Sequence, residues 1–144
     1  METNDIVMSG IQLKKLIAKK VEPIIQEYQL RPVEMDILVF LDREKNFDTA
    51  KGIMQKKHLS KAHISKSIDN LRTKGFIYIN EDENDHRVLH ISLTDKSKEV
   101  VSKVISVYEE CKDIMQKNIS SEELEIVKQV IIKINQNIND ELGE

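Results

Sequence analysis

Residues 48–93 decide the fold, and they read DTAKGIMQKKHLSKAHISKSIDNLRTKGFIYINEDENDHRVLHISL. The stretch holds two short helical patterns joined by a tight turn, and two strand-like runs rich in β-branched residues follow at once. This order predicts a helix-turn-helix with a hairpin wing, which presents its second helix to the major groove of DNA. We therefore expect a mainly α fold with one small β-hairpin, of the α+β class.

The second helix of this unit is the one expected to meet DNA. Ile64, Ile68 and Leu71 recur at the spacing of one buried helical face, and Ser60 is a suitable N-cap. Side chains on the other faces point away from the core and are expected to approach bases or flanking phosphates. This predicted contact set is Ser60, which would meet a phosphate through its backbone, with Lys61, His63, Ser65 and Lys66, and with Asp69 or Asn70 beside them.

Basic side chains are concentrated in the same stretch. Residues 48–75 hold seven Lys and Arg against two Asp, a net charge of +5, whereas the whole chain has a formal net charge of −3. Such an excess is expected of a surface that binds a polyanion. The wing differs, because residues 76–94 hold four acids and a single Arg, a net charge of −3. Arg87 is thus the wing side chain expected to enter a minor groove, with Asp85 holding its guanidinium.

Composition limits the class of protein. The 144 residues are 40% hydrophobic and 33% charged, with only 4 Gly and 2 Pro, which favours a single helix-rich domain. Cys111 is the single cysteine, so no internal disulfide can form, and its place in an apolar helical pattern predicts a buried, inert thiol. No apolar run is long enough to span a bilayer, and the first residues lack the pattern of a signal peptide. We expect a cytoplasmic protein.

Amphipathic helices are expected on both sides of the winged unit. One covers residues 6–28, with a bend at Pro23, and a further helix begins at Pro32. After the wing, Thr94 and Asp95 can cap a helix that runs to about residue 118. Ser120 with Glu123 forms a capping-box signature for the last helix. Its apolar residues recur close to a heptad pattern, at Leu124, Val127, Ile131, Ile134, Ile138 and Leu142.

These apolar stripes on the terminal helices predict that a partner covers them, and we expect this partner to be a second copy of the chain in a symmetric homodimer. Two recognition helices about one turn of DNA apart would read a palindrome. The predicted organisation is an N-terminal dimerisation helix at 1–29, a winged DNA-binding region at 30–94, and C-terminal dimerisation helices at 95–144.

Four segments of the chain resemble the MarR family of bacterial winged-helix transcription factors: Leu30-Arg31-Pro32, Leu59-Ser60-Lys61, residues 71–75, and Asp85-His86-Arg87 leading to Leu93-Thr94. The last is similar to the family's wing signature, an Asp, any residue, an Arg, and then a Leu-Thr that starts the dimerisation helix. The resemblance implies an intertwined homodimer whose wings lie over the minor groove. It also implies an effector pocket near the junction of the recognition unit and the dimerisation helices, for which the sequence selects no ligand.

The predicted function is a sequence-specific DNA-binding regulator, a homodimeric repressor of a palindromic promoter site that a small ligand releases. One alternative is a winged-helix module that binds proteins, against which the +5 charge argues. Another is a metal- or redox-responsive sensor of the same fold, with the histidines or Cys111 as the sensing groups.

The histidine spacing does not favour a metal site. His86 and His90 would lie about 13 Å apart along a strand, too far to chelate one ion. His58 belongs to the turn and His63 to the expected recognition helix, where surface or DNA-contact roles are expected. We therefore predict neither a bound metal nor a cofactor. The sequence also lacks a Gly-rich phosphate loop, a nucleophile elbow and paired carboxylates in an apolar setting, so we predict no catalytic residues.

Overall fold

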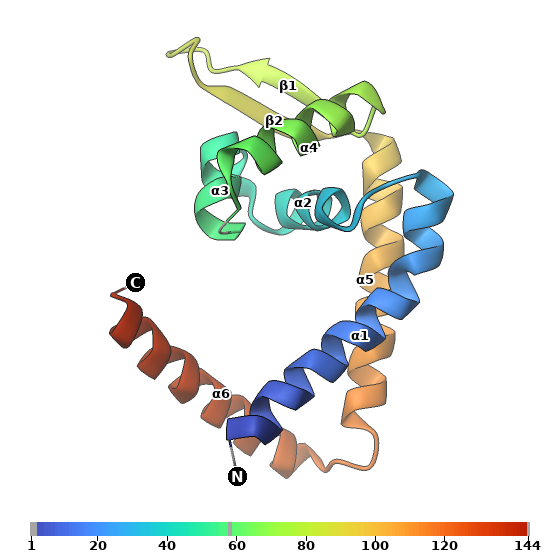
Figure 1. Cartoon of the computed structure of the whole chain (residues 1–144), viewed down its shortest axis with the longest axis vertical. Helices are drawn as coiled ribbons and strands as arrows, with labels where there is room; N and C mark the ends of the chain where they lie inside the picture. The colour runs from blue at the N-terminus through green and yellow to red at the C-terminus, as the bar shows by residue number, and fades with distance from the viewer. Residues whose placement is uncertain (1–2, 58, 144) are drawn as a thin grey trace. The chain divides into compact units, whose positions relative to one another are not determined.

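The computed structural model describes residues 3–57 and 59–143, without the side chains of residues 3, 4 and 6. The predicted turn residue His58 and the side chain of Ile6 therefore lie outside the described residues. Within them the chain forms helices and one antiparallel hairpin (Figure 1), which confirms the predicted mainly α fold. The elements are α1 (Thr3–Tyr28), α2 (Pro32–Arg43), the 3-10 helix η1 (Lys45–Phe47), α3 (Ala50–Lys57), α4 (Lys61–Thr73), β1 (Ile77–Glu81), β2 (Leu89–Leu93), α5 (Asp95–Gln116) and α6 (Ser121–Leu142).

The chain divides into two compact units, one up to Tyr108 and one from Glu109 onward. The core of the first unit lies around α2, which follows from its unbroken apolar run 37–41. The predicted stripe of α4 packs into this core, since Ile64, Ile68 and Leu71 are all buried. Figure 1 shows α3, α4 and the hairpin gathered at one end of this unit.

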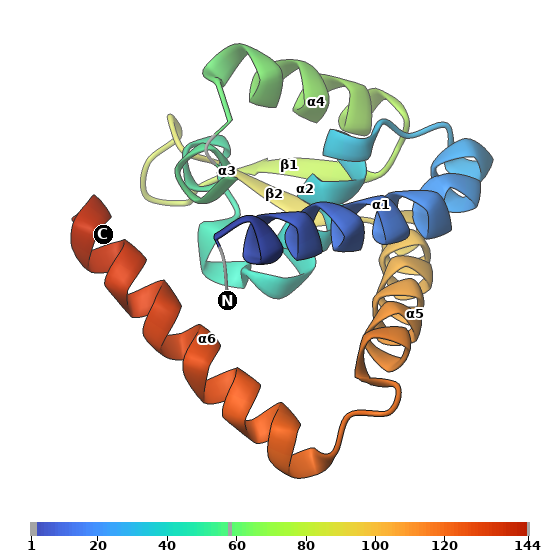
Figure 2. The same cartoon turned by 60° about the horizontal axis from the view of Figure 1, so that its bottom comes forward.

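Helix α1 contains Pro23 and runs through it as one helix (Figure 2). Proline removes one amide donor from a helix interior, yet Val21, Ile24 and Ile25 around it are buried in the core. Burial of this apolar face is what holds the helix together at Pro23. The C-terminal end of α1 also contacts α5, because the Tyr28 hydroxyl donates to Glu99 at 2.7 Å.

Local signals set the helix ends. Ser60 caps α4 as predicted, because its Oγ accepts from the His63 N–H at 3.3 Å. Thr49 caps α3, since its Oγ1 accepts from the Gly52 N–H at 3.0 Å. Gly75 follows the C-cap of α4 with a φ of +77°, a conformation that favours glycine, and it turns the chain into β1.

The hairpin is tied to the helical part of the unit at two places. Its strands pair from Ile77 opposite Leu93 to Glu81 opposite Leu89, which leaves residues 82–88 as the wing tip. Midway along β2, the Ile91 N–H donates to the Asp48 carbonyl at 2.7 Å, so this strand is joined to the segment before α3. At the base of the hairpin, the Thr94 hydroxyl donates to the Gly75 carbonyl at 2.9 Å.

The second unit consists of the end of α5 and the whole of α6. The predicted capping box is confirmed, because the Ser120 N–H donates to Glu123 at 2.8 Å and Ser120 Oγ accepts from the Glu123 N–H at 3.2 Å. Helix α5 ends at Gln116, two residues before the predicted end, and Asn118 has a positive φ of 63°. Cys111 is buried, as predicted. Along α6 no residue is buried, and the predicted apolar stripe lies at the surface.

No helix within residues 3–57 and 59–143 combines the length and the apolarity that are needed to cross a membrane.

Candidate nucleic-acid interface

A groove on the first unit collects residues from three segments that are far apart in the sequence. Its volume is about 490 Å³, and it lies between α3, the start of α4 and the wing tip. It is lined by Thr49, Ala50, Lys51, Met54, Lys61, Ile64, Ser65, Arg87, Val88 and Leu89. Three of the predicted contact residues, Lys61, Ser65 and Arg87, therefore share one surface.

The other predicted contact residues lie on the exposed faces of α4. His63 and Lys66 are exposed, and so is Ser60 at the N-terminus of the helix. Of the pair left open by the sequence, Asp69 is exposed, whereas Asn70 turns inward and donates to the Glu34 carboxylate at 3.0 Å. Asp69 therefore stays with the contact set and Asn70 does not.

Arg87 is held as the sequence predicted. Its Nε and one terminal nitrogen donate to the two carboxylate oxygens of Asp85, at 3.0 and 3.1 Å, and its backbone N–H donates to the same carboxylate at 3.1 Å. These bonds lower the pKa of Asp85, so the carboxylate remains charged and the guanidinium remains paired. The Arg87 side chain is 91% exposed, so the pair is presented at the surface and not in the core.

The seven basic residues counted from the sequence do not all face this groove. Lys74 donates to the buried carboxylate of Glu34 at 3.2 Å and to the Gln29 carbonyl at 2.6 Å, which is a structural role. Lys56 and Lys57 lie over the rings of Phe47 and Phe40, at 4.8 and 5.8 Å from the ring centres. By contrast, Lys51, Lys61, Lys66 and Arg72 have no carboxylate partner among the described residues.

The acids of the wing also differ from one another. Glu81 accepts from His86 at 2.9 Å, and Asp82 lies 2.9 Å from His90. Glu83 is exposed and has no ion pair within the described part of the chain. Two of the four acids in residues 76–94 therefore contact a histidine, and Asp85 contacts Arg87.

Comparison with known proteins decides the family. The model of the "Transcriptional regulator SarA/Rot" family matches residues 19–104, which include the whole helix-turn-helix and wing. The chain belongs to the SarA/Rot family of transcriptional regulators. It is similar to the curated HTH-type transcriptional regulator BilQ of Clostridioides difficile (strain CD3), with 24% identity over 108 residues, 74% of this chain and 72% of that protein. This SarA/Rot protein is thus a DNA-binding transcriptional regulator and not an enzyme.

Solved structures show the same fold. The MarR protein from Peptoclostridium difficile DA00132 has a TM-score of 0.77 and 20% identity, over 98% of this chain and 91% of that one. A MarR family transcriptional regulator from Listeria monocytogenes, complexed with 26mer DNA, has a TM-score of 0.76 and 18% identity over the same shares. A mutant of S. aureus MepR bound to an oligodeoxyribonucleotide has a TM-score of 0.62 and 20% identity, over 96% of this chain and 99% of that one. The resemblance to MarR proteins inferred from the sequence is confirmed at the level of the fold.

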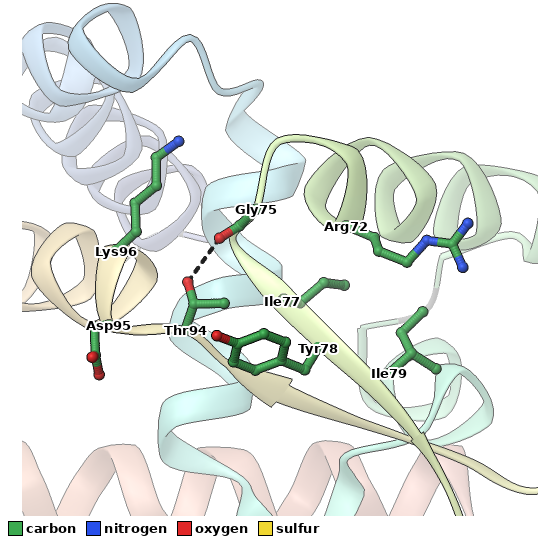
Figure 3. A pocket seen from close by; sticks show the side chains of 8 residues that line it. All are labelled: Arg72, Gly75, Ile77, Tyr78, Ile79, Thr94, Asp95 and Lys96. Atoms are coloured by element: carbon green, nitrogen blue, oxygen red, sulfur yellow. Dashed lines mark hydrogen bonds between the residues drawn. The ribbon is translucent and has the colours of Figure 1, made fainter.

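Two hollows of this SarA/Rot protein lie near the junction where the MarR resemblance implies an effector pocket. The larger, about 600 Å³, lies where α4, β1 and α5 meet and is shown in Figure 3. Lys96 extends away from Tyr78 there, so the polar groups do not converge on one point. The smaller, about 210 Å³, is lined by α1, α2 and Tyr108 and includes Asp36, whose pKa is raised by burial.

Sequence reasoning missed two features of the interface. Lys51 lines the groove but was counted only as charge, and its position in the first turn of α3 is the signal that could have found it. His90 contacts both Asp48 and Asp82 instead of lying free on its strand. No group of three or more His, Cys, Asp or Glu side chains within the described residues is arranged to hold a metal ion.

Proposed function

We propose that this regulator binds an inverted-repeat promoter site as a homodimer and represses transcription by occupying it. The observation that carries this proposal is the shared groove, because it places Lys51, Lys61 and Arg87 on one face although they lie in different segments. Lys51 and Lys61 have no carboxylate partner among the described residues, so their ammonium groups are available to DNA phosphates. In this arrangement α4 enters the major groove and the wing reaches the adjacent minor groove.

Within this proposal the contact residues have different roles. Ser65 and His63, near the start of α4, approach base edges, and Lys61 and Lys66 contact bases or flanking phosphates. Ser60 offers a phosphate its backbone at the N-terminus of α4. Asp85 orients Arg87 and does not itself touch DNA, since a carboxylate would repel phosphate.

Exposed apolar residues in both units support a dimer. In the first unit Val7, Met8 and Ile11 of α1 are exposed, and in the second unit most of the apolar side of α6 is exposed, with Leu124 and Ile134 half-buried. A soluble monomer rarely leaves such contiguous apolar surface uncovered. A second copy of this chain supplies identical stripes, so a two-fold axis would cover both at once.

Selection of binding sites from random DNA tests the proposal. The purified protein is mixed with a library of random duplexes, and bound DNA is amplified and sequenced over several rounds. We expect an inverted repeat whose half-sites lie about one helical turn apart. Enrichment of a sequence that contains no inverted repeat would contradict binding as a symmetric dimer. If no sequence is enriched, the alternative that the winged helix binds another protein is favoured.

Release of the site by a small ligand stays a prediction. The hollows near the start of α5 and beside Asp36 support the presence of space for a ligand, and they do not select its chemistry. The sensor alternative has less support, since Cys111 is buried and the described residues hold no metal-binding group.

Replacement of Arg87 tests the contribution of the wing. Arg87→Ala is expected to weaken binding of the selected operator about tenfold, because one charge-assisted contact is lost. The loss should be largest for operators with A·T-rich flanks, whose narrow minor groove attracts arginine. Asp85→Ala should also weaken binding, since the Arg87 guanidinium would lose the carboxylate that orients it. Fluorescence anisotropy across a range of salt concentrations measures these effects.

The matched control in the wing is Glu83→Gln, which removes an exposed charge that is not part of any contact in the described residues. This variant should bind as tightly as the wild type or slightly tighter. If Arg87→Ala binds like the wild type at every salt concentration, the wing does not touch DNA.

A further inference from the structure

We propose that His90 is a positioning residue for Arg87, and that it acts as a doubly protonated imidazolium that joins the wing tip to the segment before α3. The inference rests on the proposed role of Arg87 in DNA binding. His90 would be a second residue that the contact between Arg87 and DNA requires. It lies in β2 and does not line the groove.

The imidazole of His90 bridges two carboxylates from different segments. Its Nδ1 lies 2.9 and 3.0 Å from the two oxygens of Asp48, and its Nε2 lies 2.9 Å from one oxygen of Asp82. Asp48 precedes α3, and Asp82 is the first residue of the wing tip. The side chains of all three residues are about one-third exposed, so the bridge is partly shielded from solvent.

A short chain of hydrogen bonds leads from this bridge to Arg87. The second carboxylate oxygen of Asp82 accepts from the backbone N–H groups of Asn84 and Asp85, at 2.8 and 3.0 Å. Asp85 in turn holds the guanidinium of Arg87. His90 therefore fixes Asp82, Asp82 fixes the turn of the wing tip, and the turn sets the direction of Arg87.

The geometry requires the charged form of His90. A neutral imidazole has one N–H donor and one lone pair, so it could donate to one carboxylate while its lone pair faced the other. Only the imidazolium donates from both nitrogens. Loss of one proton would leave the lone pair of one nitrogen facing a carboxylate, and one side of the bridge would be lost.

The charged groups around His90 determine how it titrates. Its direct neighbours are Asp48 on one side and Asp82 on the other, and across the hairpin it faces the uncharged Asn80. Farther along the wing, Glu81 is paired with His86 and Arg87 with Asp85. In the hollow beside Asp48 the charged groups are Asp42, Lys45 and Lys98.

The direction of the pH dependence follows from these contacts. Hydrogen bonds to Asp48 and then Asp82 raise the pKa of His90 above its ordinary value of 6.5, and partial desolvation opposes this shift without reversing it. A group with a raised pKa contributes fully below its ordinary pKa, and the contribution is lost as the pH rises through the raised value. The bridge is therefore complete at mildly acidic pH and weakens in the range above 6.5. Asp82 does not limit it there, because its pKa is lowered by His90 and by backbone N–H groups.

The first experiment uses the free full-length protein and needs no operator. NMR of the histidine rings, from about pH 6 to about pH 9, reports the protonation of each imidazole, and the Nε–H signal of Arg87 reports its pairing. We expect His90 to titrate above 6.5 with both nitrogens protonated at neutral pH. We also expect the Arg87 signal to lose its paired position in His90→Gln.

His86 provides the matched control, because it lies in the same wing and pairs with a carboxylate outside the bridge. His86→Gln should leave the Arg87 signal unchanged. Titration of His90 at or below 6.5 would overturn the proposal, and so would an Arg87 signal that is the same in His90→Gln as in the wild type.

The second experiment measures binding of the duplex obtained by random-site selection. At pH 6 we expect His90→Gln to bind about tenfold more weakly than the wild type, and the difference should shrink as the pH rises. In an Arg87→Ala background the same replacement should have no further effect. An equal, independent loss in that background would overturn the proposal, because His90 would then act by another route.

The two experiments separate the inference from the function on which it rests. If Arg87→Ala and His90→Gln both bind DNA like the wild type while the Arg87 NMR signal still depends on His90, the role of Arg87 on DNA is contradicted. The positioning of its side chain by His90 is then supported.

Discussion

Replacement of Glu34 by Ala is expected to lower the free energy of unfolding by about 3 kcal/mol, because it leaves a lysine and an amide without their buried partner. The Glu34 side chain is fully buried. Its carboxylate accepts from the Arg31 N–H at 3.0 Å, from Asn70 at 3.0 Å and from Lys74 at 3.2 Å. These bonds join the start of α2 to the last turn of α4, so the variant should also loosen the recognition helix.

The Glu34 carboxylate is ionised, although burial opposes its charge. The bonds from Arg31, Asn70 and Lys74 outweigh the burial and lower the pKa of Glu34 below its ordinary value of 4.5. Its contribution to stability is therefore present above pH 4.5 and is lost as the pH falls through the lowered value.

Urea unfolding followed by circular dichroism measures the effect. Glu34→Gln keeps the shape of the side chain and removes its charge, so its loss should be intermediate, and it remains informative if Glu34→Ala fails to fold. Glu22→Ala removes an exposed glutamate from α1 and should change the unfolding free energy by less than about 0.5 kcal/mol. An unfolding midpoint for Glu34→Ala equal to that of the wild type would mean that the network contributes nothing.

Placing a charge in the apolar stripe of α6 is expected to abolish the proposed dimer. Ile134 lies in the middle of this stripe, and most of the stability of a protein helix comes from the packing of its apolar face. Ile134→Glu would have to bury a carboxylate between subunits, which costs several kcal/mol if it stays unpaired. Sedimentation velocity should therefore show monomers.

The control for this variant is Gln136→Glu, two positions along the helix and thus about 200° around it, on the polar side. It adds the same charge and should leave the sedimentation coefficient of the dimer unchanged. A dimer that survives Ile134→Glu would place the interface on another surface, with Val7 and Ile11 of α1 as the next residues to test.

The features that were predictable from the sequence are those that depend on near neighbours in the chain. The Ser60 cap accepts a hydrogen bond from the residue three positions later, and the capping box joins Ser120 to Glu123, also three positions later. Gly75 is required by the positive φ of a single residue. The Asp85–Arg87 pair spans two residues and was also predicted. Each of these depends on chemistry that one turn of chain contains.

The features that could not be predicted join residues far apart in the sequence. Glu34 and Asn70 are 36 positions apart, and Asp48 and His90 are 42 positions apart, so no local spacing connects them. Charge counting included Lys74 in the basic excess of residues 48–75, because a count does not distinguish a free ammonium from a paired one. Glu34, third in a helix that opens with Pro32, did carry a local signal for its bond to Arg31, though not for its bond to Lys74.

The attachment of α5 to the end of α4 has a mechanical consequence. Thr94 donates to the Gly75 carbonyl through its hydroxyl and to the Phe76 carbonyl through its backbone, and Lys96 donates to the Lys74 carbonyl at 3.0 Å. These bonds join the recognition helix α4 to the first turns of α5, so the two helices are expected to move together, with Gly75 at their junction. In the proposed dimer, a tilt of a few degrees in α5 would change the distance between the two copies of α4, and so the half-site spacing that the regulator accepts.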